Sequence, residues 1–334
     1  MIRIHKHFLT LCALLLASSV SAQATSESPA HDWSDPESEH RVEVEGGQIW
    51  VRVNGDLNAE KAPAIFIHGG PGGTHMGFGN LLSMADERAI ILYDQLGSGL
   101  SDPIADPAGR PVEHFVRSLE AIRAALEIER WHVVGHSWGA ALALEYAAAY
   151  PDHTVSAVLS GTYISTPHWI TGTNLLIRQL PDAVQADLAA CEGPNPPAEK
   201  VCKAATKAFY DTYNGRADAP TPPKAAFDYM KRYRGAGRNS ALYNAMWGSS
   251  EFSATGTLLD YNATPLLSKI DGSRTLFMVG QYDEARIDDV QEFAQLAKGS
   301  ELAVIPGGSH SFLRERPAIA EAILRSWLNR KDAE

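Results

Sequence analysis

Short apolar segments alternate with amphipathic ones over most of this chain of 334 residues. The segments "APAIFI", "RAIILY", "RWHVV" and "TVSAVL" are apolar almost throughout and are bounded by turn-forming residues, which is typical of parallel strands buried on both faces. Between residues 112 and 126 apolar residues recur every three to four positions, as on one face of a helix. This alternation predicts an α/β fold, a mostly parallel sheet flanked by helices.

The alternation is interrupted once. Residues 165–265 contain proline, glycine and helical fragments but no clear buried strand, and strands and helices then resume with "SRTLFMVG" and "ELAVI". We therefore expect a core made of residues 40–164 and 266–334, with a helical cap inserted between late strands. Ligands bind at the carboxyl ends of the strands in open α/β sheets, so the cap is expected to cover the site.

The N-terminal segment has the pattern of an export signal. Residues 1–22 begin with Arg3 and Lys6, continue with an apolar run and end in small residues. The apolar run is about half of the ~20 residues needed to cross a bilayer, which makes an uncleaved anchor the weaker alternative. Residues 23–39 are polar and rich in serine and proline, and we interpret them as a flexible leader. A periplasmic or secreted location is expected.

Charge and cysteine content narrow the classes of partner. Without residues 1–22 the chain has 27 basic and 40 acidic residues, a formal charge of −13, which disfavours nucleic acid and anionic membranes as partners. Cys12 lies in the predicted signal peptide, which leaves Cys191 and Cys202. An oxidising compartment favours a disulfide between these two, and the alternative is two buried thiols.

A nucleophile is indicated by the segment "GHSWG". It follows the predicted strand "RWHVV" and opens an alanine-rich helical segment. The pattern G-x-S-x-G between a strand and a helix is a nucleophile elbow, in which a sharp turn lifts the serine above the sheet and glycines prevent collisions. We therefore expect Ser137 to be a catalytic nucleophile. An epoxide hydrolase or dehalogenase would normally carry aspartate at this position.

A serine hydroxyl needs a base, and in this architecture an acid and then a histidine follow it along the chain. The segment "VGQYDEAR" ends a late strand and offers Asp283 or Glu284; we choose Asp283 because it is closer to the strand. The segment "IPGGSHSF" follows the last strand and offers His310. His310 would accept the proton of Ser137, and Asp283 would orient the imidazole and stabilise its charged form.

The glycine-rich segment "HGGPGG" follows the strand "APAIFI", and its glycines allow backbone N–H groups to approach a ligand closely. We expect the amides of Gly70 and Trp138 to form an oxyanion hole. The sequence contains no H-E-x-x-H, no His/Cys/Asp cluster at metal spacing, no P-loop and no dinucleotide fingerprint. No metal and no cofactor are therefore expected.

One further carboxylate stands out in "YNAMWGSSEF". Glu251 is surrounded in sequence by tryptophan, methionine and phenylalanine, and a charge among apolar groups is costly unless a cation pairs with it. A cap arginine could be that cation, with Arg232, Arg234 and Arg238 nearby in the sequence. In that case Glu251 would only hold the cap in shape.

Taken together, these segments resemble the α/β hydrolases of the proline iminopeptidase family. The resemblance rests on "HGGPGG", "LYDQLGSGLSDP", "GHSWGA", "YNAMWGSSEF", "GQYDEA" and "GGSH", which occur in the family's order. It implies a helical cap, hydrolysis of the bond after an N-terminal residue, and a triad of Ser137, Asp283 and His310. It also implies that Glu251 binds the α-ammonium group of the substrate.

Two departures from the family pattern concern specificity. Members with strict proline preference commonly have D-Q-R-G, whereas this chain has Leu96 in place of the arginine. The form "DQLG" resembles the tricorn-associated aminopeptidases and L-amino-acid amidases, which have broader specificity. The segment "FYDTYNGRADAP" aligns loosely with a family segment that carries a tyrosine and an acid, which suggests Tyr210 and Asp218 as further substrate-binding residues.

Three functions remain open at this stage. The first is a serine exopeptidase or amidase that releases an N-terminal amino acid, proline or another small or apolar residue, from a small molecule or short peptide with a free amine. The second is an esterase or lactonase on the same scaffold, which would not need Glu251. The third is a non-catalytic binding protein, which a complete triad disfavours.

Overall fold

The computed structural model of the protein describes residues 33–106, 110–233 and 237–334. The predicted signal peptide and the leader up to residue 32 lie outside these ranges. Within them, no helix is long and apolar enough to cross a membrane.

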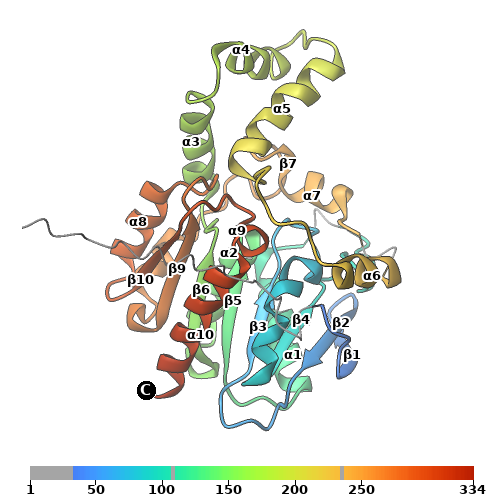
Figure 1. The fold of residues 1–334 in the computed structure, drawn as a ribbon, viewed down its shortest axis with the longest axis vertical. Coiled ribbons are helices and arrows are strands. Elements are labelled where there is room, and N and C mark those ends of the chain that lie inside the picture. Colours follow the sequence, from blue (N-terminus) through green and yellow to red (C-terminus); the bar gives the residue numbers. More distant parts are fainter. Residues whose placement is uncertain (1–32, 107–109, 234–236) are drawn as a thin grey trace, which may run out of the picture.

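An eight-stranded sheet forms the centre of the molecule, with the strand order β1-β2-β4-β3-β5-β6-β9-β10 (Figure 1). The strands are β1 Ser38–Val44, β2 Gly47–Asn54, β3 Ala64–Ile67, β4 Ile90–Tyr93, β5 Trp131–His136, β6 Thr154–Ser160, β9 Thr275–Gly280 and β10 Glu301–Ile305. β1 pairs with β2 and β2 with β4 in antiparallel fashion, and the other pairs are parallel. The predicted α/β fold with a mostly parallel sheet is confirmed.

Helices cover both faces of this sheet, because strands that are apolar on both sides must be buried on both sides. One face packs against α1 Val112–Ala125, α2 Trp138–Ala149 and α8 Ile287–Leu296. The other packs against the 3-10 segment η1 His75–Asp86, against α9 Phe312–Glu315 and against α10 Pro317–Asp332. The carboxyl ends of β3, β5 and β9 are left free of these layers, and the cap lies there.

The cap is inserted between β6 and β9. It contains α3 Thr166–Ile177, α4 Asp182–Cys191, α5 Glu199–Tyr213, α6 Lys224–Arg232, α7 Ser240–Met246 and a small hairpin of β7 Gly248–Ser250 and β8 Ser253–Ala254. In Figure 1, α4 and α5 lie furthest from the sheet. Short 3-10 turns at Thr264–Ser268 and Gly272–Arg274 lead back to β9.

The predicted disulfide is present in the outer part of the cap. Cys191 at the end of α4 is bonded to Cys202 in α5, with 5.7 Å between the Cα atoms. The two helices therefore form one arm. Its inner end is held by a small apolar cluster that includes Leu188, Phe209 and Phe252.

The boundary of the leader differs from the expectation. Residues 23–39 were expected to be flexible, but β1 begins at Ser38 and Trp33 is buried. The indole of Trp33 lies against Gly79, where an added Cβ would be 2.5 Å from the ring, and it packs on Tyr229 of α6. One aromatic side chain therefore fixes residues that are polar on average.

Candidate active site

Ser137 lies in the sharp turn between β5 and α2. Its φ of 57° is in the left-handed region, which non-glycine residues rarely adopt, and its backbone N–H donates to the carbonyl of Ser160. The flanking glycines are needed because the backbone segments approach each other closely here. A Cβ on Gly139 would collide with the carbonyl oxygen of Ile67, and a Cβ on Gly135 would collide with the carbonyl oxygen of Gly139. The geometry is that of a nucleophile elbow.

Asp283 and His310 follow the last two strands and meet beside this turn. Nδ1 of His310 is 2.7 Å from Oδ1 of Asp283, and both side chains are buried. The Asp283 carboxylate also accepts the N–H groups of Gly280 and Ala285, which fixes its orientation. Asp283 therefore holds a proton on Nδ1, leaving Nε2 as the nitrogen available to Ser137.

The second acid of "YDEAR" faces the same histidine from the opposite side. Oε1 of Glu284 lies 3.7 Å from Nε2 of His310 and accepts a hydrogen bond of 2.6 Å from the amide of Asn214. Glu284 is 1% exposed, and its Oε2 has no hydrogen-bond partner within the described residues. A buried carboxylate oxygen without a donor is costly, and it marks a place for one.

The predicted oxyanion donors lie at the ends of two neighbouring loops. Gly70 has a φ of +118°, and an added Cβ there would be 2.7 Å from the backbone nitrogens of Gly72 and Gly73, so only glycine fits. Its neighbour Gly69 packs directly on the Cβ of Ser137. Trp138 is the first residue of α2, where backbone N–H groups have no partner in the helix. Both expected donors thus belong to loops beside the nucleophile.

Glu251 lies in the cap, just after β7. The hydroxyl of Tyr243 donates to its Oε1 over 2.7 Å, its N–H donates to the hydroxyl oxygen of Tyr210, and its carbonyl accepts the indole N–H of Trp169. Tyr210 therefore contacts the backbone of Glu251 rather than its carboxylate. Among the described residues, the carboxyl group accepts its side-chain hydrogen bond from Tyr243, at Oε1.

No arginine forms an ion pair with Glu251 in the part of the chain that the structure describes. Arg232 pairs with Asp35, and Arg238 lies over the ring of Tyr243, 4.1 Å from its centroid. Arg234 lies outside the described residues. Burial raises the pKa of Glu251, although the Tyr243 hydrogen bond and the charges of His310 and Arg238 oppose this.

Asp218 does not lie where the family resemblance suggested. Its side chain is exposed and pairs with Arg316 at 2.8 Å and with Arg216 at 3.1 Å. The expectation that it is the second acid for the substrate amine is therefore not met, because two arginines already hold its carboxylate at the surface. The acid that lies beside His310 is instead Glu284. Its signal in the sequence was an acid directly after Asp283 at a strand end.

Electrostatics couple these acids. Burial and the nearby charge of Glu251 raise the pKa of Glu284 well above its ordinary value. Burial disfavours a charged His310, but Asp283, Glu284 and Glu251 outweigh burial and raise its pKa to about 9. The site therefore has an excess of acidic groups, and a cation that entered it would be stabilised.

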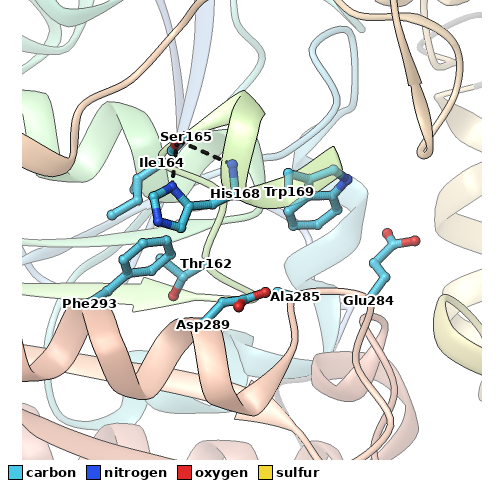
Figure 2. Close-up of a pocket in the computed structure, with 9 residues that line it drawn as sticks. All are labelled: Thr162, Ile164, Ser165, His168, Trp169, Glu284, Ala285, Asp289 and Phe293. Atoms are coloured by element: carbon cyan, nitrogen blue, oxygen red, sulfur yellow. Dashed lines mark hydrogen bonds between the residues drawn. The ribbon is translucent and has the colours of Figure 1, made fainter. Parts of the chain in front are cut away.

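A small cavity lies behind Glu284, between α3 and α8 (Figure 2). Its lining includes His168, Trp169, Asp289 and Phe293. Figure 2 shows Glu284 at one end, with its carboxylate directed away from His168 and Asp289. Ser137 does not line this cavity, so we assign the reaction to the turn around Ser137 and not to the cavity. No group of three or more potential metal ligands occurs among the described residues.

Comparisons with known proteins show the family to which the chain belongs. Residues 63–317 match the family described as "alpha/beta hydrolase fold". The proline iminopeptidase of Heyndrickxia coagulans is 30% identical over 288 residues, which cover 86% of this chain and 97% of that protein. The proline iminopeptidase of Lactobacillus helveticus is 30% identical over 303 residues, 88% of this chain and 98% of that protein. The crystal structure of proline iminopeptidase from Mycobacterium smegmatis superimposes with a TM-score of 0.78 at 30% identity, covering 89% of this chain and 99% of that one.

Proposed function

We propose that this chain, which belongs to the proline iminopeptidase family of α/β hydrolases, is a serine aminopeptidase or amidase that releases one N-terminal residue from peptides or amino-acid amides. The observation that carries the proposal is the pair of acids at Ser137: Glu284 with a buried, unpartnered oxygen and Glu251 with no arginine partner in the described residues. An esterase or lactonase would have no use for this pair. An α-ammonium group would satisfy both.

We infer a reaction through an acyl-enzyme. Ser137 Oγ attacks the carbonyl carbon of the N-terminal residue, and its proton passes to Nε2 of His310. The N–H groups of Gly70 and Trp138 stabilise the oxyanion. The proton on His310 is then transferred to the leaving amine, and a water molecule hydrolyses the acyl-enzyme by the same route in reverse order.

By binding the ammonium group at a fixed distance from Ser137, the two glutamates would restrict cleavage to the bond after the first residue. Glu251 belongs to the cap and Glu284 to the core loop that carries Asp283, and the two are near enough for the charge of Glu251 to raise the pKa of Glu284. A substrate whose ammonium binds between them can place only its first carbonyl at Ser137. Beside them, Tyr163, Trp169 and Trp247 pack edge to face, and Trp169 also lies edge-on to His310. This apolar wall suits proline or another small apolar side chain.

We propose an extracytoplasmic location as well. It is supported by the predicted export signal in residues 1–22 and by the disulfide between Cys191 and Cys202, since disulfides persist in oxidising compartments. Fractionation of cells, followed by N-terminal sequencing of the recovered protein, checks it. A mature chain that begins near residue 23 in the periplasm or medium is expected.

The activity is tested with aminoacyl arylamides, their N-acetylated counterparts and short acyl esters. We expect the free-amine substrates to have the highest kcat/KM, with proline or small apolar residues preferred. Ser137→Ala should lose several orders of magnitude in rate while keeping its fold. Chelators are expected to have no effect. Preference for N-acetylated substrates or esters would contradict the proposal, and so would full activity of Ser137→Ala.

A further inference from the structure

Three carboxyl groups surround His310. Asp283 bonds to Nδ1 at 2.7 Å, Glu284 lies 3.7 Å from Nε2, and Glu251 is close enough to favour the charged imidazole. No lysine or arginine forms an ion pair with any of these three acids within the described ranges. The charge of Arg238 also acts on Glu251, whereas the imidazole of His310 is the cationic group that lies directly against Asp283 and Glu284.

The other side chains around His310 do not supply a charge that would replace it. His136, from the end of β5, packs against His310 with its ring tilted and 4.7 Å between ring centroids, and burial, His310 and Arg314 all lower its pKa. Trp169 of α3 lies edge-on to His310, 5.6 Å between centroids, and is neutral. Burial raises the pKa of Tyr243, which keeps its proton on the hydroxyl that contacts Glu251.

This arrangement creates a conflict with catalysis. An imidazolium carries a proton on both ring nitrogens and cannot accept the proton of Ser137, and no hydrogen bond links Ser137 to His310 in the described structure. The base is available only when Nε2 is deprotonated. Something must therefore displace the proton from His310 if the enzyme is to work near neutral pH.

We propose that the substrate's own ammonium group frees His310 for base catalysis: in the empty site the three acids around His310 together favour its charged form, and the ammonium takes the place of the imidazolium as the cation among them. The inference rests on the proposed function. When the ammonium binds, the proton on Nε2 leaves to solvent. The proton on Nδ1 stays on the ring, hydrogen-bonded to Asp283. The freed lone pair on Nε2 then accepts the proton of Ser137.

The consequence is a selectivity that acts on the chemical step as well as on binding. A like charge within about 4–6 Å typically lowers the pKa of a histidine by roughly 1–3 units. A bound ammonium would therefore lower the pKa of His310 from about 9 into the neutral range. An ester without an amine would leave this pKa unchanged, so that His310 would stay charged and unable to act as a base. Linkage requires the reverse effect too: the imidazolium weakens ammonium binding by the same factor.

The direct test is the titration of His310 by nuclear magnetic resonance. Ser137→Ala protein with ¹⁵N-labelled histidine is titrated with and without saturating prolinamide or alaninamide, and the His310 signals are assigned by comparison with Ser137→Ala/His310→Gln. In the free protein we expect the titration midpoint of His310 near pH 9. With ligand bound, this midpoint should fall by at least about one pH unit. Because the imidazole is observed itself, deprotonation of the ligand or of a glutamate cannot imitate the result.

A bound amide that leaves the midpoint unchanged would overturn the inference but not the proposed function. A free-protein midpoint near the ordinary value for histidine, 6.5, would overturn it as well. If the amides neither bind nor are hydrolysed, the proposed function is wrong and the inference falls with it.

A second test uses Glu284→Gln, with Asp218→Asn as a matched control at a surface acid. The pH dependence of kcat reports groups in the enzyme–substrate complex, so for wild-type protein we expect a more alkaline midpoint with p-nitrophenyl acetate than with a free-amine arylamide. Glu284→Gln should hydrolyse the ester about tenfold faster near pH 7 for each unit that its midpoint falls, and the arylamide more slowly. A merely structural Glu284 would slow both substrates, which contradicts the inference.

Discussion

The sharpest consequence of the proposed function concerns Glu251→Gln. The substitution removes a charge but little else, since a glutamine Oε1 can still accept the Tyr243 hydroxyl. The other contacts of residue 251, to Tyr210 and Trp169, use its backbone and are kept. The variant therefore separates the charge of Glu251 from its structural role in the cap.

The expected magnitude follows from the interaction that is lost. A hydrogen bond to a charged group contributes about 1.5–3 kcal/mol, which corresponds to about 10- to 200-fold in kcat/KM at roughly 1.4 kcal/mol per decade. The loss applies only to substrates that carry a free amine. The stability of the fold should not decrease, because the substitution removes one of two neighbouring negative charges. The charge of Glu251, together with burial, raises the pKa of Glu284.

The assay compares each free-amine arylamide with its N-acetylated form and with a short ester, at one pH and for both variants. Asp218→Asn is the control, because Asp218 is an exposed cap acid that pairs with Arg316 and Arg216. We expect Asp218→Asn to match wild type on all substrates within about twofold, since exposed ion pairs contribute little. Glu251→Gln should lose activity on the free amines alone.

Two results would refute this reasoning. Equal losses on all three substrate types, together with a lowered melting temperature, would mean that Glu251 supports the cap and does not bind an amine. Equal losses in Asp218→Asn would mean that the cap responds to any change of charge. Either result would restore the esterase or lactonase as the better proposal.

Further predictions concern stability. Replacing both Cys191 and Cys202 with alanine should lower the free energy of unfolding by very roughly 3 kcal/mol, as measured by urea denaturation without reductant; an unchanged midpoint would show that the bridge contributes nothing. Gly139→Ala should yield little folded protein, because the added Cβ collides with a carbonyl of β3, and circular dichroism of the soluble fraction checks this. Burial opposes the charge of Asp332, but hydrogen bonds to a buried histidine and to Arg88 prevail and lower its pKa to about 2. A carboxyl group whose pKa is lower in the folded than in the unfolded protein stabilises the fold at every pH above its unfolded pKa, which is about 4. Asp332→Asn should therefore lower the free energy of unfolding by about 2 kcal/mol at neutral pH. This difference should narrow as pH falls from 4 to 2 in urea titrations, and a constant difference would contradict the assignment.

The core could be predicted because its signals are local. A strand buried on both faces needs a run of apolar residues, as in β3 and β5, and the candidate residues Ser137, Asp283 and His310 lie in the loops that follow β5, β9 and β10. Even the choice between Asp283 and Glu284 was settled by distance from the strand end. The structure adds that both acids face His310, one at each ring nitrogen.

The cap was harder to predict because its contacts are long-range. Its helices are short and several have no side-chain N-terminal cap, so their bounds leave little trace in the sequence. Asp218 was chosen because it lay in the right segment, but the charge of that segment is neutralised by Arg316, 98 residues further on. Trp33 is a similar case, because this single indole among polar residues packs against Tyr229 of α6, which is distant in the sequence.

The position of His310, the proposed base, also depends on the cap. The backbone N–H of His310 donates to the carbonyl of Tyr213, and that of Ser311 donates to the carbonyl of Asn214 at the end of α5. The amide of Asn214 then bonds to Glu284, so the same turn holds the base and the acid beside it. The disulfide ties α5 to α4, so this turn belongs to the arm that lies furthest from the sheet. The proposed binding of the amine and the proposed release of the base therefore share one support, the turn at the end of α5, which is what a site that couples the two requires.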